Sequence, residues 1–178
     1  MSVFQKILIA DAGPLIALTK IQQLKLLPEL FSTIIITDLI SDELGITNKK
    51  SSFQFDGSDA LIDAIQANWL KINVDQSTSK RHYYPTNPGV DPGEASAISL
   101  AISMQEANLE LAILIDDRCG RAEARQQNIE VIGTAGLLLI AKEYALINKC
   151  VPLLLEMQNK GYYLSNKLIN LIAIKANE

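Results

Sequence analysis

Short apolar runs alternate along the chain with longer segments in which apolar residues recur at helical spacing. The short runs are rich in β-branched residues, as is typical of buried strands. They are Ile7–Ala10, Thr33–Thr37, Leu70–Val74, Leu111–Ile115 and Ile129–Ile132. The longer segments predict helices at Pro14–Leu30, Leu39–Leu44, Asp59–Gln66, Pro92–Ala107 and Arg118–Gln127. Because strands separated by helices need crossover connections, the pattern predicts an α/β fold, a three-layer α/β/α sandwich with a central, mainly parallel sheet.

The pattern becomes entirely helical after Gly133, with apolar residues at helical spacing around Leu137, Leu153 and Leu168. We expect a single domain over residues 1–178, with a helical C-terminal extension over about residues 134–178. The pattern leaves open whether this extension packs on the sheet or on a partner. The polar, turn-rich segment Asp75–Val90 predicts an exposed loop.

Composition narrows the class of protein further. The chain has 178 residues, 48% of them hydrophobic, with a net charge of −4 and two cysteines. The charge argues against a bulk DNA-binding domain. The cysteines form neither a CxxC pair nor a zinc-like cluster, and no apolar run has the length of a membrane span. We therefore expect a cytoplasmic protein with reduced thiols and no membrane contact.

Acidic residues stand where the predicted strands end. Asp11 follows the first strand and the pair Asp116–Asp117 follows the fourth, while Glu43 and Glu94 lie near helix ends. Ligands of open parallel sheets bind beyond the carboxyl ends of the strands. Each acid taken singly could be a helix cap, and a helix N-terminus also favours the charges of Glu94 and Asp91. Several acids at the same edge of the sheet indicate a binding or catalytic site instead.

A cluster of carboxylates needs a cation to neutralise it. The chain has a single histidine, His82, and no cysteine cluster, so zinc is not favoured over Mg²⁺ or Mn²⁺, which prefer oxygen ligands. Hydrolysis of a phosphodiester bond is the chemistry that such a site supports.

Five segments together resemble the PIN domain, and more narrowly its VapC-like subgroup of bacteria and archaea. They are "ADAGPLIALTKIQQLKLLPELF", "SDEL", "DPGEASAISLAI", "IDDRCGRAEARQQNIEVIGTAG" and "GYYLSNKLIN". The resemblance implies an α/β/α sandwich and a Mg²⁺- or Mn²⁺-dependent ribonuclease with an acidic site. It also implies a toxin of a toxin–antitoxin pair, with a protein antitoxin as partner and a homodimer as assembly.

Carried over residue by residue, the resemblance assigns catalytic roles to Asp11, Glu43, Glu94 and Asp116. Asp11, Glu94, Asp116 and Asp117 are the candidate metal ligands, and the fourth family acid is either Asp116, which directly ends the strand, or Asp117. The family often has Ser or Thr two residues after the first acid, where this chain has Gly13. A hydroxyl that could orient a ligand is therefore absent from that position.

Basic and polar residues follow the same strand. Arg118 and Arg121 are candidates for contacts with RNA phosphates, and Arg125 shares their predicted helix. The other interpretation is a solvated face on which these arginines pair with Glu123 or Asp117. Thr134 is a candidate substrate contact as well, although a helix N-cap is its more common role.

The loop sequence "KRHYYP" offers a second candidate contact. Lys80 and Arg81 with Tyr83 and Tyr84 could hold single-stranded RNA, or they could be ordinary surface residues.

Two other functions are alternatives to a metal-dependent endoribonuclease. The first is a catalytically weak or inactive PIN-like interaction module, which Gly13 favours. The second is a phosphoacceptor receiver domain, but the paired acids after the first strand and the lysine near the last strand that it needs are missing.

Overall fold

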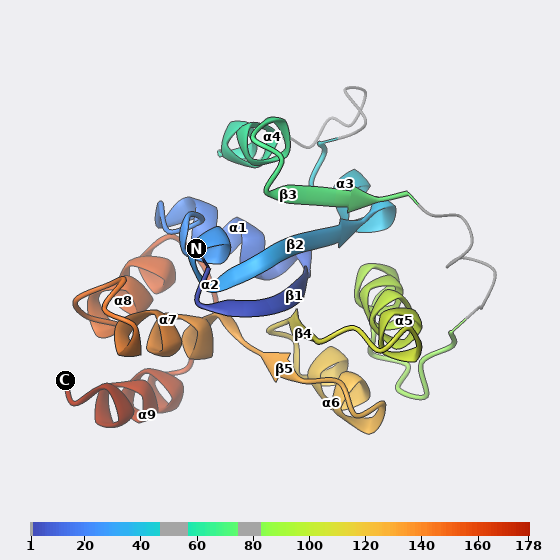
Figure 1. Ribbon diagram of the computed structural model, residues 1–178. Helices are drawn as coiled ribbons and strands as arrows, with labels where there is room; N and C mark the ends of the chain where they lie inside the picture. The colour runs from blue at the N-terminus through green and yellow to red at the C-terminus, as the bar shows by residue number, and fades with distance from the viewer. Residues whose placement is uncertain (1, 47–56, 75–82) are drawn as a thin grey trace.

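A parallel sheet forms the centre of the protein, in a computed structural model that describes residues 2–46, 57–74 and 83–178 (Figure 1). The sheet has the strand order β3-β2-β1-β4-β5, and every neighbouring pair is parallel. The strands are β1 Phe4–Ala10, β2 Phe31–Thr37, β3 Leu70–Asn73, β4 Leu111–Leu114 and β5 Val131–Ile132. The predicted α/β fold is confirmed, and the sheet is parallel throughout.

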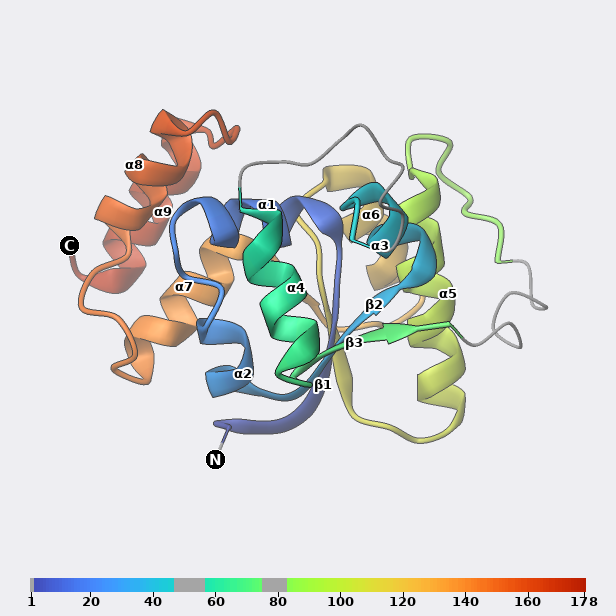
Figure 2. The ribbon, with the colours of Figure 1, turned by 90° about the horizontal axis from the view of Figure 1, so that it is seen from above.

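Helices cover both faces of this sheet. They are α1 Ala12–Lys20, α2 Leu26–Leu30, α3 Asp38–Glu43, α4 Ser58–Gln66, α5 Pro92–Glu106, α6 Arg118–Gln126, α7 Thr134–Glu143, α8 Val151–Asn159 and α9 Asn166–Ala176. Figure 2 shows α5 and α6 on one side of the sheet and α1, α2 and α7 on the other, with α8 and α9 beyond α7. All four residues of β4 and the last three of β1 are buried, as expected of strands covered on both faces.

The predicted helix Pro14–Leu30 is wrong, because the chain forms two helices, α1 and α2, in its place. Gln22 has a φ of 57° and ends α1. Its N–H donates to Thr19 O at 3.0 Å, and the N–H of Gln23 donates to Leu18 O at 2.9 Å. This pair of bonds is a Schellman motif, which usually takes Gly in the left-handed position. With Gln there, the sequence carries no signal for the break.

The C-terminal extension packs on the rest of the protein through α7, which contacts α1, and α7 and α8 both contact α9. Glu178 joins α7 to α8, because its carboxylate accepts from Lys142 Nζ at 2.7 Å and from the N–H groups of Cys150 and Val151. Cys119 and Cys150 are free thiols, as expected. None of the helices in the described ranges is long and apolar enough to cross a membrane.

The segment before α5 is anchored to α6 by the buried carboxylate of Glu123. That carboxylate accepts from Tyr83 OH at 2.5 Å, from the N–H and hydroxyl of Thr86 at 2.8 and 3.0 Å, and from the N–H of Asn87 at 3.2 Å. Among the described residues Glu123 therefore does not pair with the arginines of α6, which was one interpretation of that helix face. Tyr83 is half-buried, so the predicted exposed loop is partly covered at this residue.

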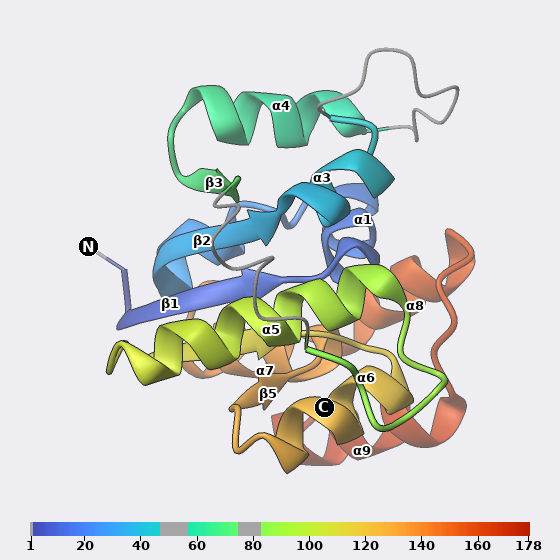
Figure 3. The same cartoon turned by 90° about the vertical axis from the view of Figure 1, so that its right-hand side faces the viewer.

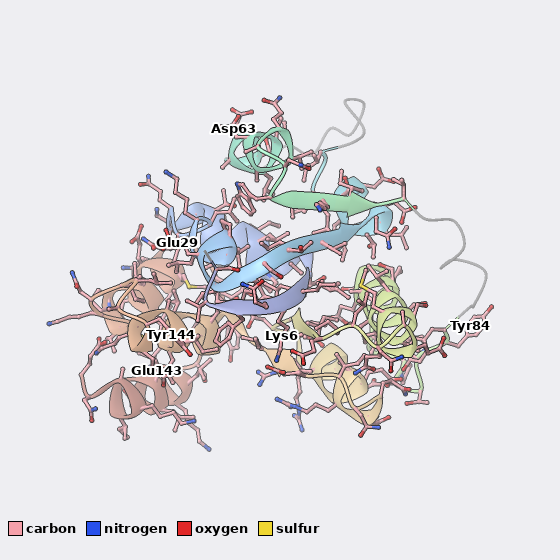
Figure 4. All side chains as sticks on the ribbon, viewed as in Figure 1. Lys6, Glu29, Asp63, Tyr84, Glu143 and Tyr144 are labelled. Carbon is pink, nitrogen blue, oxygen red and sulfur yellow. The ribbon has the colours of Figure 1, made fainter. Side chains whose placement is uncertain are left out.

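The neighbouring Tyr84 projects outward at 77% exposure (Figure 4). The residues that precede it in the candidate RNA contact, Lys80, Arg81 and His82, lie outside the described residues.

Glu123→Gln is expected to lower the free energy of unfolding by roughly 1–3 kcal/mol, because the amide nitrogen cannot accept from these buried donors. The burial of Glu123 raises its pKa, but its hydrogen bonds outweigh that effect and hold the pKa below the usual value. The loss is therefore largest above the usual pKa of glutamate and shrinks as the pH falls below it.

Urea unfolding at pH 7 and pH 3.5 measures this loss. Glu130→Gln, which removes only an exposed ion pair with Lys6, is the control, with a change within about 0.5 kcal/mol. Equal effects of the two variants would contradict the role of Glu123.

Candidate active site

Two strands of the sheet centre bring Asp11 and Asp116 to the same edge. Ala10 of β1 is paired with Leu114 of β4, and the N–H of Asp11 donates to Leu114 O at 2.9 Å. Asp11 then caps α1, where its carboxylate accepts from the N–H of Gly13. In Figure 3 the strands point to the right, and α1, α5 and α6 all begin at that end. The first turns of these helices therefore face the carboxyl ends of the strands.

Glu94 reaches this edge from the first turn of α5. Asp91 caps the helix and accepts from the N–H of Glu94 at 2.8 Å, while Glu94 accepts from the N–H of Asp91 at 3.2 Å, which is a capping box. The hydroxyls of Ser96 and Thr37 lie 2.6 Å apart and join the start of α5 to the end of β2. Glu94 is thereby fixed, and only 2% exposed.

Glu43, the last residue of α3, lies exposed at the mouth of the site beside Asp91. A Cβ placed on Gly93 would lie 3.0 Å from Glu43 Oε2 and 3.2 Å from Asp91 Oδ1, so both carboxylates reach the same glycine. Asp91 was not among the predicted site residues. The signal for it was the D-x-x-E spacing of "DPGE", which we interpreted only as favourable helix-end charge.

Burial and mutual repulsion raise the pKa values of these carboxyl groups. The pKa of Asp11 rises to about 7, first because the group is buried and then because of the charges of Asp91 and Glu43. The pKa of Glu94 also rises to about 7, by burial and then by the charges of Asp91, Asp117 and Asp11. Burial and Asp91 raise the pKa of Glu43 as well. These shared effects couple Asp11, Glu43, Asp91 and Glu94 in one electrostatic cluster.

Asp116 is held by more hydrogen bonds than any other acid described at this edge. Its Oδ1 accepts from the N–H of Thr134 at 2.8 Å, and its Oδ2 accepts from Tyr162 OH at 2.6 Å and from the Thr134 hydroxyl. Thr134 is fully buried, and Gly133 is the N-cap of α7, so the predicted N-cap role of Thr134 is wrong. Tyr162 was missed: its segment, "GYYLSNKLIN", carries part of the family resemblance, but nothing in that segment marks the tyrosine as a site residue.

Asp117 instead caps α6, where its Oδ1 accepts from the N–H groups of Cys119 at 2.6 Å and Gly120 at 3.3 Å. Its charge also contributes to the raised pKa of Glu94. Asp116 and Asp117 therefore both border the cluster, one fixed by side chains and the other by a helix end.

Arg118 and Arg121 lie on the first turns of α6 at the same edge. Arg118 is exposed, whereas Arg121 is half-buried. A Cβ placed on Gly133 would lie 3.7 Å from Arg121 Nη1 and 2.9 Å from Asp116 Oδ1, so both atoms lie on the same side of that glycine. Among the described residues, the buried Arg121 Nε has no hydrogen-bond partner. An N–H group of this kind can donate a hydrogen bond to a phosphate oxygen.

The donor set of the cluster fits a hard divalent cation. In the ranges that the structure describes, no three His, Cys, Asp or Glu side chains are already arranged to hold one ion. Within the same ranges, no lysine or arginine forms an ion pair with Asp11, Glu43, Asp91 or Glu94. These carboxyl groups raise one another's pKa values, and no described cationic side chain compensates their charge. Mg²⁺ and Mn²⁺ prefer charged oxygen ligands of this kind.

A comparison with protein-family models agrees with this architecture. The family model DUF3368, a PIN domain, matches residues 7–178. One similar solved structure is a PilT N-terminus domain protein from the hyperthermophilic archaeon Sulfolobus solfataricus P2. It is 14% identical, with a TM-score of 0.47 over 74% of this chain and 89% of that chain. A comparison with curated proteins found no match.

Gly120→Ala is expected to destabilise the protein by roughly 1–3 kcal/mol, because the new methyl would overpack the space between α6 and the site. Its Cβ would lie 2.5 Å from Ile115 Cδ1 and 2.8 Å from the carboxyl carbon of Glu94. Gly136→Ala on α7 is the control, since its Cβ meets nothing closer than 4.0 Å. The control is expected to be neutral or to stabilise by up to about 1 kcal/mol. Urea unfolding of both variants measures the difference, and equal effects would contradict the close packing of Gly120 on Glu94.

Asp11→Asn is expected to stabilise the metal-free protein at pH 8 by roughly 1–3 kcal/mol. A raised carboxyl pKa contributes stability that is present below the unfolded pKa near 4 and is lost as the pH rises through about 7. Asparagine keeps the helix cap and removes the charge. Urea unfolding in EDTA at pH 5 and pH 8 tests this, with Asp63→Asn on α4 as control. An Asp11→Asn variant that keeps the parent's loss of stability between these pH values would contradict the prediction.

Proposed function

Because the chain belongs to the PIN-domain family, whose fold is that of nucleases, we propose that it is a Mg²⁺- or Mn²⁺-dependent endoribonuclease that hydrolyses RNA phosphodiester bonds. The observation that carries the proposal is the electrostatic cluster of Asp11, Glu43, Asp91 and Glu94. Its acids come from different elements, and the pKa values of three of them rise through burial and mutual repulsion. A structural role alone gives no reason to gather them.

Asp11, Glu94, Asp116 and Asp117 would hold the cation, and Asp91 joins them as a ligand candidate. A divalent cation bound here would activate water for attack on phosphorus and neutralise charge on the phosphate. Thr134 and Tyr162 hold both oxygens of Asp116 in place, which fixes the direction of its remaining lone pairs. Glu43 is exposed at the mouth, where it can accept a proton from water or give one to the leaving oxygen.

Arg118 and Arg121 would contact the RNA backbone beside the acids. The protein has a net charge of −4, so RNA, a polyanion, is expected to bind where positively charged side chains are concentrated. Arg121 has a buried Nε with no partner in the described part of the chain, and its Nη1 lies near Gly133 on the same side as Asp116 Oδ1. Thr134 is fully buried behind Asp116, and we assign it to orient that carboxylate rather than to touch substrate.

We further propose that the enzyme is the cytoplasmic toxin of a toxin–antitoxin pair and acts as a homodimer restrained by a protein antitoxin. The basis for this proposal is the resemblance of the sequence to VapC-like proteins. Expression of the chain alone should then arrest growth of a bacterial host, and expression of its Asp11→Asn variant should not.

A catalytically weak or inactive interaction module remains the second candidate, favoured by the lack of a preassembled three-ligand set among the described residues. The two functions differ in metal affinity. Calorimetric titration with Mn²⁺ should show binding for a nuclease and little or none for an inactive module.

Asp11→Asn and Glu94→Gln are expected to lower Mn²⁺-dependent cleavage of RNA by at least about 100-fold, since each removes a charged oxygen from the cluster. Both changes keep a helix-capping side chain, so the fold should stay intact by circular dichroism. Asp63→Asn and Glu29→Gln make the same chemical changes at exposed residues of α4 and α2 that are not part of the site (both labelled in Figure 4), and these variants should cleave like the parent. Cleavage that survives both site substitutions would overturn the proposed nuclease.

A further inference from the structure

The C-terminal extension contributes one side chain to the acidic site. Tyr162 lies between α8 and α9, and its hydroxyl donates to Asp116 Oδ2 at 2.6 Å. Burial and the adjacent charge of Asp116 raise the pKa of this phenol far above its usual value. Tyr162 is therefore placed to donate a hydrogen bond to Asp116.

The same hydroxyl faces the gap beside Asp11 that Gly13 leaves open. A Cβ placed on Gly13 would lie 3.7 Å from Tyr162 OH and 3.6 Å from Asp11 Oδ2. A serine at position 13 would extend its own hydroxyl into this gap. The phenol oxygen thus lies next to the place where a hydroxyl on α1 would act.

The turn after α8 determines where Tyr162 points. Gly161 has a φ of +84°, its N–H donates to Gln158 O at 3.0 Å, and the N–H of Tyr162 donates to Met157 O at 3.0 Å. This is a Schellman motif, with glycine in the left-handed position. Two further bonds join this turn to the end of α1: Lys160 Nζ donates to Lys20 O at 2.5 Å, and Lys20 Nζ donates to Lys160 O at 3.4 Å. The turn that carries Tyr162 is therefore fixed both by its own backbone hydrogen bonds and by its hydrogen bonds to the end of α1.

We propose that Tyr162 is a positioning residue of the acidic site, which supplies from the C-terminal extension the hydroxyl that Gly13 does not provide. Tyr162 fixes Asp116 together with Thr134 and presents its oxygen between Asp116 and Asp11. Cation binding at the site then depends on the docking of the turn after α8 against the end of α1. The inference rests on the proposed function, because it concerns the same cation site.

Tyr162→Phe tests this inference, with Tyr163→Phe as matched control, because Tyr163 is the next residue and is 90% exposed. Loss of the phenol oxygen is expected to weaken Mn²⁺ binding about 10- to 100-fold by calorimetric titration, as removal of a residue that orients a ligand commonly does. Mn²⁺ should also perturb the tyrosine absorbance of the parent and of Tyr163→Phe, and this perturbation should be smaller in Tyr162→Phe. Urea unfolding in EDTA checks that the variant is folded.

Rescue separates positioning from general stabilisation. Gly13→Ser in the Tyr162→Phe background returns a hydroxyl to the gap from the other side, and φ at position 13 is not left-handed, so serine fits the backbone. Mn²⁺ affinity should recover in the double variant, at least in part.

The outcomes are distinct. A Tyr162→Phe variant that binds Mn²⁺ like the parent, or that loses no more affinity than Tyr163→Phe, would overturn the inference and leave the proposed function standing. If Gly13→Ser restores no Mn²⁺ affinity in the Tyr162→Phe background, the claim that Tyr162 supplies the hydroxyl missing at position 13 is wrong. A parent chain that binds no Mn²⁺ would overturn the proposed function and, with it, the inference.

Discussion

Carboxylates buried against an apolar sheet repel one another, and the fold has to compensate this repulsion before any chemistry is possible. Helix ends supply part of the compensation. Asp11 caps α1, Asp91 and Glu94 form the capping box of α5, and Asp117 caps α6. Each of these acids accepts N–H groups at the positive end of a helix, where negative charge is stabilised. Of the acids that would bind a cation, all but Asp116 thus lie at the start of a helix.

Close approach of the backbone is the second requirement of the site. Gly93, Gly120 and Gly133 each lie against a carboxylate of the cluster, and a Cβ on any of them would come within 3.0 Å of a carboxyl atom. Glycine within or beside a helix lowers its stability by about 1 kcal/mol relative to alanine, so its use here needs a reason. That reason is space for the carboxylates, because larger residues would force the acids apart and remove their electrostatic coupling.

The sequence predicted those features that depend on neighbouring residues. Strand cores such as Ile34–Ile36 and the acids at strand ends could be recognised because burial and strand direction act locally. Tyr162 could not, since it reaches Asp116 only through the fold, from 46 positions away. The break at Gln22 was also invisible, because tertiary packing tolerates a left-handed residue that is not glycine. Asp91 was seen but interpreted as helix-end charge alone.

The distribution of positively charged side chains indicates where in the site a cation would bind most favourably. Arg121 lies on the Asp116 side of Gly133, and Tyr162 and Thr134 donate to Asp116, so this side already has donors and a nearby guanidinium. No described lysine or arginine pairs with Asp11, Glu43, Asp91 or Glu94. A divalent ion therefore relieves repulsion among these four acids, whereas Asp116 already has a guanidinium nearby that attracts it. This asymmetry leaves the arginine free to meet the phosphate of a bound RNA, while the carboxylates meet the ion.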